Sequence, residues 1–162
     1  MVQRDRDSRF DMTRYFTEYR LRRGLESLTG ISGLGTEVEH NDASGPDNSL
    51  LRIGVMYKHT LGGLGRANWF QWRVLPYETD GSGQQLSLIH FMQLSKRFNW
   101  VGFIDFHVNR SSPNRWVTES QITCQIHGPI RLALEARYNG FLNANPAADG
   151  FGLALAISVG PQ

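Results

Sequence analysis

Residues 130–139 read IRLALEARYN, and this stretch decides the fold. Its side chains alternate in character from one residue to the next, and successive side chains of a β-strand point to opposite faces. The stretch therefore predicts a strand with one apolar and one polar face. The apolar positions are Ile130, Leu132, Leu134, Ala136 and Tyr138, and between them lie Arg131, Ala133, Glu135, Arg137 and Asn139.

The same alternation occurs on both sides of this stretch. Residues 116–127 alternate before it, and residues 151–159 (FGLALAISV) alternate after it. The turn at 127–129 and a polar loop at 141–150 separate the three runs. Amphipathic strands of about ten residues, with an aromatic residue near an end of the apolar face, are typical of a transmembrane β-barrel.

Further strands are predicted upstream, and no segment shows a helical period. The predicted runs are residues 10–21, 25–38, 51–58, 69–75, 85–94 and 100–109. Gly30, Gly33 and Gly35 interrupt the second run, where we expect bends or bulges rather than a phosphate-binding loop. Pro76 is expected to end the fourth run. Tight links (22–24, 61–66, 95–99, 127–129) alternate with looser polar ones (39–49, 77–84, 110–114, 141–149), an asymmetry typical of outer-membrane barrels.

The pattern predicts an all-β fold, an up-and-down antiparallel meander that closes as a β-barrel of about 9–10 strands. Residues 1–9 are expected to be disordered or loop-like, and residues 10–160 to form a single barrel domain. Bacterial single-chain barrels have an even number of strands. About nine predicted strands therefore place one further strand, together with a signal peptide, upstream of Met1.

Composition narrows the function classes. The formal net charge of +2 does not favour nucleic acid as a partner. The five histidines lie far apart without a metal-ligand spacing, and a single cysteine, Cys124, forms no internal disulfide, so neither a metal nor another cofactor is expected. The sequence contains no run of about 18 apolar residues, so it predicts no transmembrane helix. The first residues do not read as a signal peptide, which predicts a cytoplasmic location if the chain is complete and the outer membrane otherwise.

The sequence resembles small bacterial outer-membrane β-barrel proteins. The resemblance is carried by residues 94–98 (LSKRF), 131–138 (RLALEARY) and 151–159, and it covers most of residues 50–160. It implies an outer-membrane location, membrane lipid as a partner, and a porin-like, transport-related or structural role. Such barrels usually end in an aromatic residue, whereas this sequence ends Val159-Gly160-Pro161-Gln162.

The polar faces supply candidate lumen residues with two interpretations. A small barrel is filled by its own side chains, which predicts paired charges that fill the interior. Alternatively, a narrow pore with an excess of cations would favour small polar or anionic solutes. The candidate lumen residues are Arg52, Lys58, Arg73, Asp105, His107, Glu119, Arg131, Glu135 and Arg137.

The apolar faces supply candidate lipid contacts. Aromatic residues near strand ends are expected to form a girdle at the level of the lipid headgroups. The predicted lipid-facing residues are Leu132, Leu134, Phe151, Leu153, Leu155 and Ile157, and the predicted girdle is Tyr57, Trp72, Trp100, Trp116 and Tyr138.

Two alternatives remain open. In a soluble lipocalin-like barrel that binds an apolar ligand, the polarity inverts, so that the same leucines line the interior and the charged residues face water. In an outer-membrane lipid hydrolase, Asp105 and His107 would act with Ser87 or Ser120, but their mutual geometry does not follow from sequence. We do not expect an enzyme, and the sequence predicts no oligomeric state.

Overall fold

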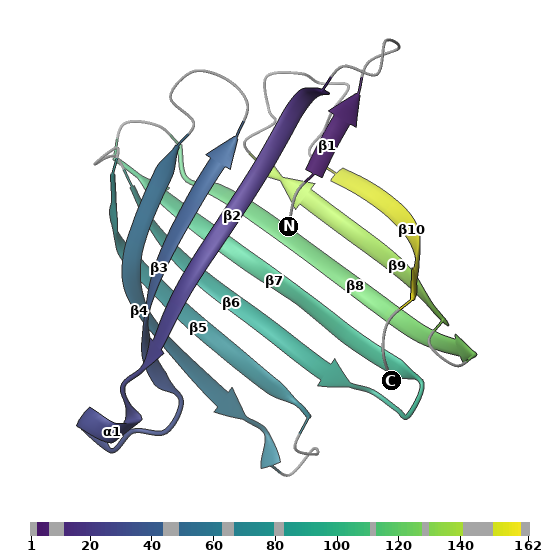
Figure 1. Ribbon diagram of the computed structural model, residues 1–162, viewed down its shortest axis with the longest axis horizontal. Helices are drawn as coiled ribbons and strands as arrows, with labels where there is room; N and C mark the ends of the chain where they lie inside the picture. The colour runs from purple at the N-terminus through teal and green to yellow at the C-terminus, as the bar shows by residue number, and fades with distance from the viewer. Residues whose placement is uncertain are drawn as a thin grey trace.

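A computed structural model describes residues 3–6, 12–43, 49–62, 67–79, 83–110, 113–127, 130–140 and 151–159. These residues form one antiparallel sheet of ten strands in which each strand pairs with its neighbour in sequence (Figure 1). The elements are β1 (Gln3–Arg6), β2 (Met12–Gly24), α1 (Glu26–Thr29), β3 (Leu34–Ala43), β4 (Leu50–Thr60), β5 (Trp69–Glu78), β6 (Gly83–Gln93), β7 (Phe98–Asn109), β8 (Arg115–His127), β9 (Ile130–Asn139) and β10 (Phe151–Val159). The predicted all-β antiparallel meander is therefore confirmed.

The alternation in sequence becomes an alternation in burial. In β5, Gln71 and Arg73 are buried whereas Trp72 and Val74 are exposed. The polar face of the strand is thus the covered one, and the apolar face is the open one. This is the reverse of a water-soluble sheet, which buries its apolar face against a core.

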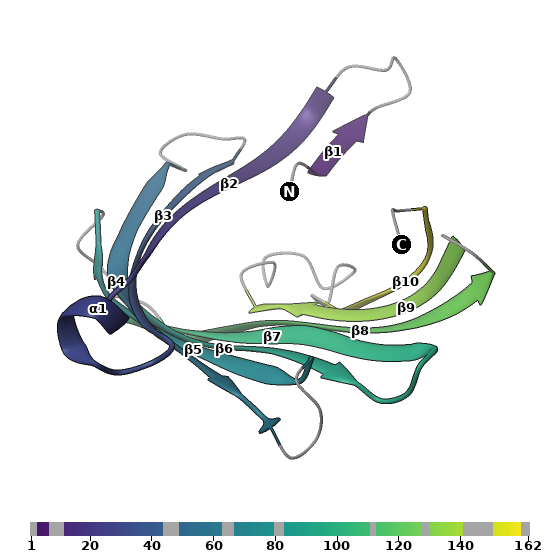
Figure 2. The same cartoon turned by 60° about the horizontal axis from the view of Figure 1, so that its bottom comes forward.

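The sheet is strongly curved, as Figure 2 shows: β2 and β3 rise on one side and β8 to β10 lie on the other. The polar face lines the inside of the curve. The two edges of the described sheet are β1 and β10, and its hydrogen-bond order runs from one to the other without joining them. The described structure is accordingly a curved, open sheet.

The links alternate between two ends of the sheet. The strand ends that are joined by residues 25–33, 61–68, 94–97 and 128–129 lie at one end of the sheet, which we call the α1 end. The strand ends that are joined by residues 44–49, 79–82, 110–114 and 140–150 lie at the opposite end. The predicted contrast in length is wrong at 25–33, which is long because it contains α1, and at 79–82, which is short. The predicted turn at 22–24 is also wrong, because these residues continue β2 and pair with β3.

Two predicted boundaries differ at the start of the chain. Within residues 1–9, which were expected to be loop-like, Gln3–Arg6 forms β1 and pairs with β2, whereas residues 1–2 and 7–9 lie outside the described residues. β1 is therefore a strand in addition to the nine that the sequence predicts. The predicted strand at 25–38 is instead a turn followed by β3, which continues through residues 39–43 that were read as loop.

Pro76 does not end the fourth predicted strand. Strand β5 continues through Glu78 because the register shifts at this point, so that Ile53 pairs with Tyr77 and Val55 with Val74. Such a bulge accommodates a proline, which lacks a backbone donor for the ladder. The bulge brings the backbone of β5 onto Gly54, where a Cβ atom would overlap the carbonyl oxygen of Val74.

The substitution Gly54→Ala is expected to lower the free energy of unfolding by about 1–3 kcal/mol, because the added methyl group must displace the backbone of the bulge. The measurement is the denaturant midpoint of the folded protein, followed by tryptophan fluorescence. Gly24→Ala is the matched control, since a Cβ atom at that strand position meets nothing within 4 Å. Equal midpoints for the two variants would contradict the close approach at Gly54.

Candidate functional site

Opposite charges stand side by side along the inner faces of β2 to β5. Arg20 pairs in register with Glu39, Glu39 with Arg52, and Arg52 with Glu78. Arg20 Nε donates to Glu39 Oε2 (2.9 Å), Arg52 Nη1 donates to Glu39 Oε1 (3.1 Å), and Arg52 Nε donates to Glu78 Oε2 (2.6 Å). We call these four residues the charge ladder, because their signs alternate across four adjacent strands.

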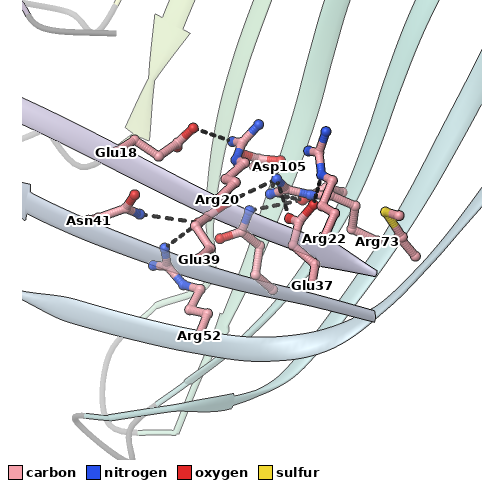
Figure 3. Close-up of polar contacts among 12 residues, drawn as sticks. Glu18, Arg20, Arg22, Glu37, Glu39, Asn41, Arg52, Arg73 and Asp105 are labelled. Atoms are coloured by element: carbon pink, nitrogen blue, oxygen red, sulfur yellow. Dashed lines mark hydrogen bonds and ion pairs between the residues drawn. The ribbon is translucent and has the colours of Figure 1, made fainter. Parts of the chain in front are cut away.

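Arg73 of β5 joins the charge ladder to the rest of the inner face. Its Nη1 atom lies 2.9 Å from Glu37 Oε1 and 2.9 Å from Glu39 Oε2. Its Nη2 atom donates to Ser87 Oγ (3.1 Å) and lies 4.0 Å from Asp105 Oδ1. The Arg73 side chain is 1% exposed and that of Glu37 is 0% exposed. A single guanidinium group therefore ties β3, β6 and β7 to β5 (Figure 3).

Together these groups form an interior ion-pair cluster, which is the candidate functional site. Two further arginine contacts complete it, from Arg20 to Glu18 (2.8 Å) and from Arg22 to Glu37. The cluster contains the charge ladder with Glu18, Arg22, Glu37, Arg73 and Asp105, that is, four guanidinium groups and five carboxylates. Burying a charge is costly unless it is paired, so the balance of signs is what makes this burial possible.

Three of the predicted lumen residues belong to this cluster. Arg52, Arg73 and Asp105 come from β4, β5 and β7, and ion pairs hold each of them on the inner face. His107 is half-buried on the same face of β7, two residues beyond Asp105. In this part of the inner face the charged side chains are thus paired and largely buried.

The other predicted lumen residues lie away from the cluster. On β8 and β9, Glu119 pairs in register with Arg137, and Gln121 Nε2 donates to Glu135 Oε2 (3.2 Å); these side chains are half-buried. Lys58 and Arg131 share the same face but lie near the α1 end and are exposed. The Nζ atom of Lys58 lies 4.3 Å from the centroid of a ring of Trp69.

Sequence reasoning missed most of the carboxylates of the cluster. Glu37 and Glu39 were assigned to a poorly patterned segment and a loop, and the arginines of β2 were read partly as a turn. The alternation of Gly35, Glu37 and Glu39 with Thr36 and Val38 was a usable signal for β3. Within the cluster, five carboxylates face four guanidinium groups, so the cluster itself has no excess of cations.

The apolar residues of β9 and β10 project from the other face. Leu134 is 57% exposed and Ile157 is 73% exposed, and Leu132, which pairs in register with Ile157, is also exposed. The side chains of the other predicted lipid-facing residues, Phe151, Leu153 and Leu155, lie outside the described residues, although their backbone belongs to β10. The open face of this part of the sheet is thus aliphatic.

The predicted girdle residues lie toward both ends of the sheet. Tyr57 and Trp72 are cross-strand partners in the half of the sheet nearer the α1 end, and Trp100 lies near the start of β7 at that end; all three are exposed. At the opposite end, Trp116 is exposed, and the centroid of its ring lies 4.3 Å from the centroid of the Phe106 ring. Tyr138 is half-buried at the same end. The outer face therefore carries aromatic rings near both of its margins.

Of the two serines considered for hydrolysis, Ser87 is the register partner of Asp105 and is hydrogen-bonded to it, whereas Ser120 is separated from Asp105 and His107. Ser87 Oγ accepts hydrogen bonds from Arg73 and from Gln85 Nε2 (2.9 Å), beside Asp105. Ser120 lies on the outer face, where its Oγ accepts a hydrogen bond from Trp100 Nε1 (2.8 Å). Two donors on a serine oxygen oppose nucleophilic attack, since they withdraw the lone pairs that would react. Within the described ranges, no group of three or more His, Cys, Asp or Glu side chains is arranged to hold a metal ion.

The fold and the site define a curved antiparallel sheet with an ionic inner face and an apolar outer face. No helix in the described part of the chain has the length and apolarity needed to cross a membrane. No protein-family model, no curated protein and no solved structure matches the chain.

The substitution Glu39→Gln is expected to lower the free energy of unfolding by about 3–5 kcal/mol, because it leaves buried guanidinium groups without their shared carboxylate. The measurement is the denaturant midpoint at low and at high salt; the deficit should persist in salt, since buried pairs are weakly screened. Glu26→Gln is the control, because Glu26 is exposed on α1 and forms no ion pair with a described residue. A deficit no larger than that of the control would contradict the role of the charge ladder.

Proposed function

We propose that this protein is a transmembrane β-barrel of the bacterial outer-membrane type. The observation that carries the proposal is the polarity of the sheet: side chains such as Leu134 and Trp72 are exposed on one face, whereas Arg73 and Glu39 are buried on the other. A bilayer is the solvent in which this arrangement is stable, because its hydrocarbon accepts the apolar face and the interior of the barrel encloses the charges.

The polarity argues against the soluble alternative. A lipocalin-like barrel needs Leu132, Leu134 and Ile157 inside and arginines outside, whereas these three side chains are exposed and Arg52 and Arg73 are buried. In water, an apolar surface that extends over most of the strands would promote aggregation. The rows of exposed side chains across β7, β8 and β9, such as Trp100, Ile122 and Leu134, form such a continuous surface.

The proposal includes closure of the sheet between β1 and β10. In lipid, the free backbone groups of an edge strand cannot be hydrogen-bonded by water, so a spanning sheet must close. Ten strands is an even number. β1 runs away from the α1 end and β10 runs toward it, so the two edge strands are antiparallel to each other. Both features are those of single-chain outer-membrane barrels.

The interior favours a structural barrel over an open pore. The side chains of Glu37, Glu39 and Arg73 are almost completely covered already in the open sheet. Closure of the sheet would only bring further side chains toward them. An interior filled in this way leaves little room for solutes, so we propose that the barrel has a structural role in the membrane.

The membrane proposal is tested by the partition of the protein, expressed with an added export signal, between soluble and detergent-extracted fractions. We expect a detergent-dependent protein whose folded form migrates differently in boiled and unboiled gel samples. The variant Leu134→Arg should reduce the folded fraction in vesicles, because an arginine on the lipid face costs about 2–4 kcal/mol at the middle of a bilayer.

Leu28→Arg is the matched control, since Leu28 is 75% exposed but lies on α1, outside the strands. It should fold as well as the parent protein. A soluble, monomeric protein in which both variants are tolerated equally would overturn the proposal, because an exposed leucine that faces water can be replaced by arginine at little cost.

A filled interior predicts little or no conductance for the parent protein in a planar bilayer. The double variant Glu39→Ala/Arg73→Ala removes both signs at once and should raise the single-channel conductance, because it deletes two large interior side chains without adding net charge. Arg23→Ala/Glu26→Ala is the charge-matched control at the α1 end, where both residues are exposed. Large channels in the parent protein would show that the cluster does not fill the lumen.

A further inference from the structure

The α1 end carries exposed basic side chains with few acidic ones. Within three residues of its four links, Glu26 is the one exposed carboxylate among the described residues. Outside the ion-pair cluster, the exposed basic side chains there are Arg23, Lys58, Lys96, Arg97 and Arg131. Lys58 and Arg131 lie on the inner face, so we call Arg23, Lys96 and Arg97 the basic rim. Apart from the contact of Lys58 with Trp69, none of these basic side chains forms an ion pair or ring contact with a described residue. Among the described residues, no carboxylate therefore offsets these charges.

The link between β6 and β7 presents two of these charges on a fixed turn. The backbone amides of Leu94 and Ser95 both donate to the carbonyl oxygen of Phe98 (2.9 and 3.1 Å). Ser95 Oγ accepts from the amides of Arg97 (3.2 Å) and Phe98 (3.1 Å), and the carbonyl oxygen of Arg97 accepts from the amide of Gln125 (2.8 Å). The backbone that carries Lys96 and Arg97 is thus held by the turn itself and by β8.

Apolar side chains adjoin these cations directly. Leu94 and Phe98 are exposed on either side of Lys96 and Arg97. Trp100 is exposed two residues beyond Phe98 on β7, and its indole nitrogen donates a hydrogen bond to Ser120. Tryptophan prefers the boundary between hydrocarbon and headgroups, and lysine and arginine side chains extend from this boundary toward water. The turn therefore places two cationic side chains next to exposed apolar side chains at the α1 end.

We propose that the basic rim binds the phosphate groups of anionic phospholipids and so fixes the α1 end in a headgroup layer. This inference rests on the proposed membrane function and adds a partner of defined chemistry. A guanidinium group matches a phosphate through two parallel hydrogen bonds, and a lysine adds a point charge. The adjoining apolar residues contact the acyl chains of the same lipid, which free phosphate could not provide.

The test uses the full-length protein reconstituted in phosphatidylcholine vesicles that contain increasing fractions of phosphatidylglycerol. Brominated forms of each lipid quench tryptophans that they contact, so the quenching curves give the relative affinity for the two headgroups. We expect a preference for phosphatidylglycerol that falls about fivefold for each neutralised rim charge. The variants are Arg97→Gln and the double variant Lys96→Gln/Arg97→Gln. High salt should reduce the preference, because exposed charges are screened.

Arg110→Gln is the matched control, since Arg110 is an exposed arginine that directly follows β7 at the opposite end. It should keep the preference of the parent protein. Equal quenching by both lipids in the parent protein, or an equal loss in Arg97→Gln and Arg110→Gln, would overturn the inference while leaving the membrane function intact. A protein that brominated phosphatidylcholine does not quench at all has not entered the bilayer, and that result would overturn both proposals.

Discussion

The charge ladder Arg20–Glu39–Arg52–Glu78 is the interaction on which the remaining structure depends. Each buried carboxylate or guanidinium group would be costly alone, and each is offset by a group of opposite sign on the neighbouring strand. Because the signs alternate, every strand from β2 to β5 must be present for its neighbour to be satisfied. The ladder therefore couples the formation of one hairpin to that of the next.

The ladder also fixes the register of the strands. A slip of one residue between β3 and β4 would move a full set of side chains to the other face, placing carboxylates on the apolar side and aliphatic residues on the ionic side. The register shift opposite Gly54 lies close in β5 to Arg73, which contacts Glu39 in the cluster. Register and charge pairing are thus two consequences of one arrangement of side chains.

Much of this arrangement follows from the sequence, though not all of it. The parity of residues 116–138 predicts the faces of β8 and β9 correctly, because each strand is read from its own residues. The sequence does not predict the partners of Arg73. Glu37 and Glu39 lie two strands away from Arg73, and the register of the strands decides whether they come close to it. Strand β1 was missed because its four residues, Gln-Arg-Asp-Arg, are all polar and show no apolar alternation. Pro76 was expected to end its strand, but a bulge accommodates it, and the bulge depends on pairing with the neighbouring strand.

The strictly sequential order of the strands has a consequence for how the chain reaches this structure. Every described pairing joins strands that are consecutive in the chain, so each pairing closes a loop of modest length and pays a small entropic cost. Contacts of short sequence separation favour rapid folding, and a meander can grow one hairpin at a time. Arg73 is the exception in that it reaches Glu37 and Glu39 on β3 and Asp105 on β7, so its contacts form only after several hairpins have assembled around it.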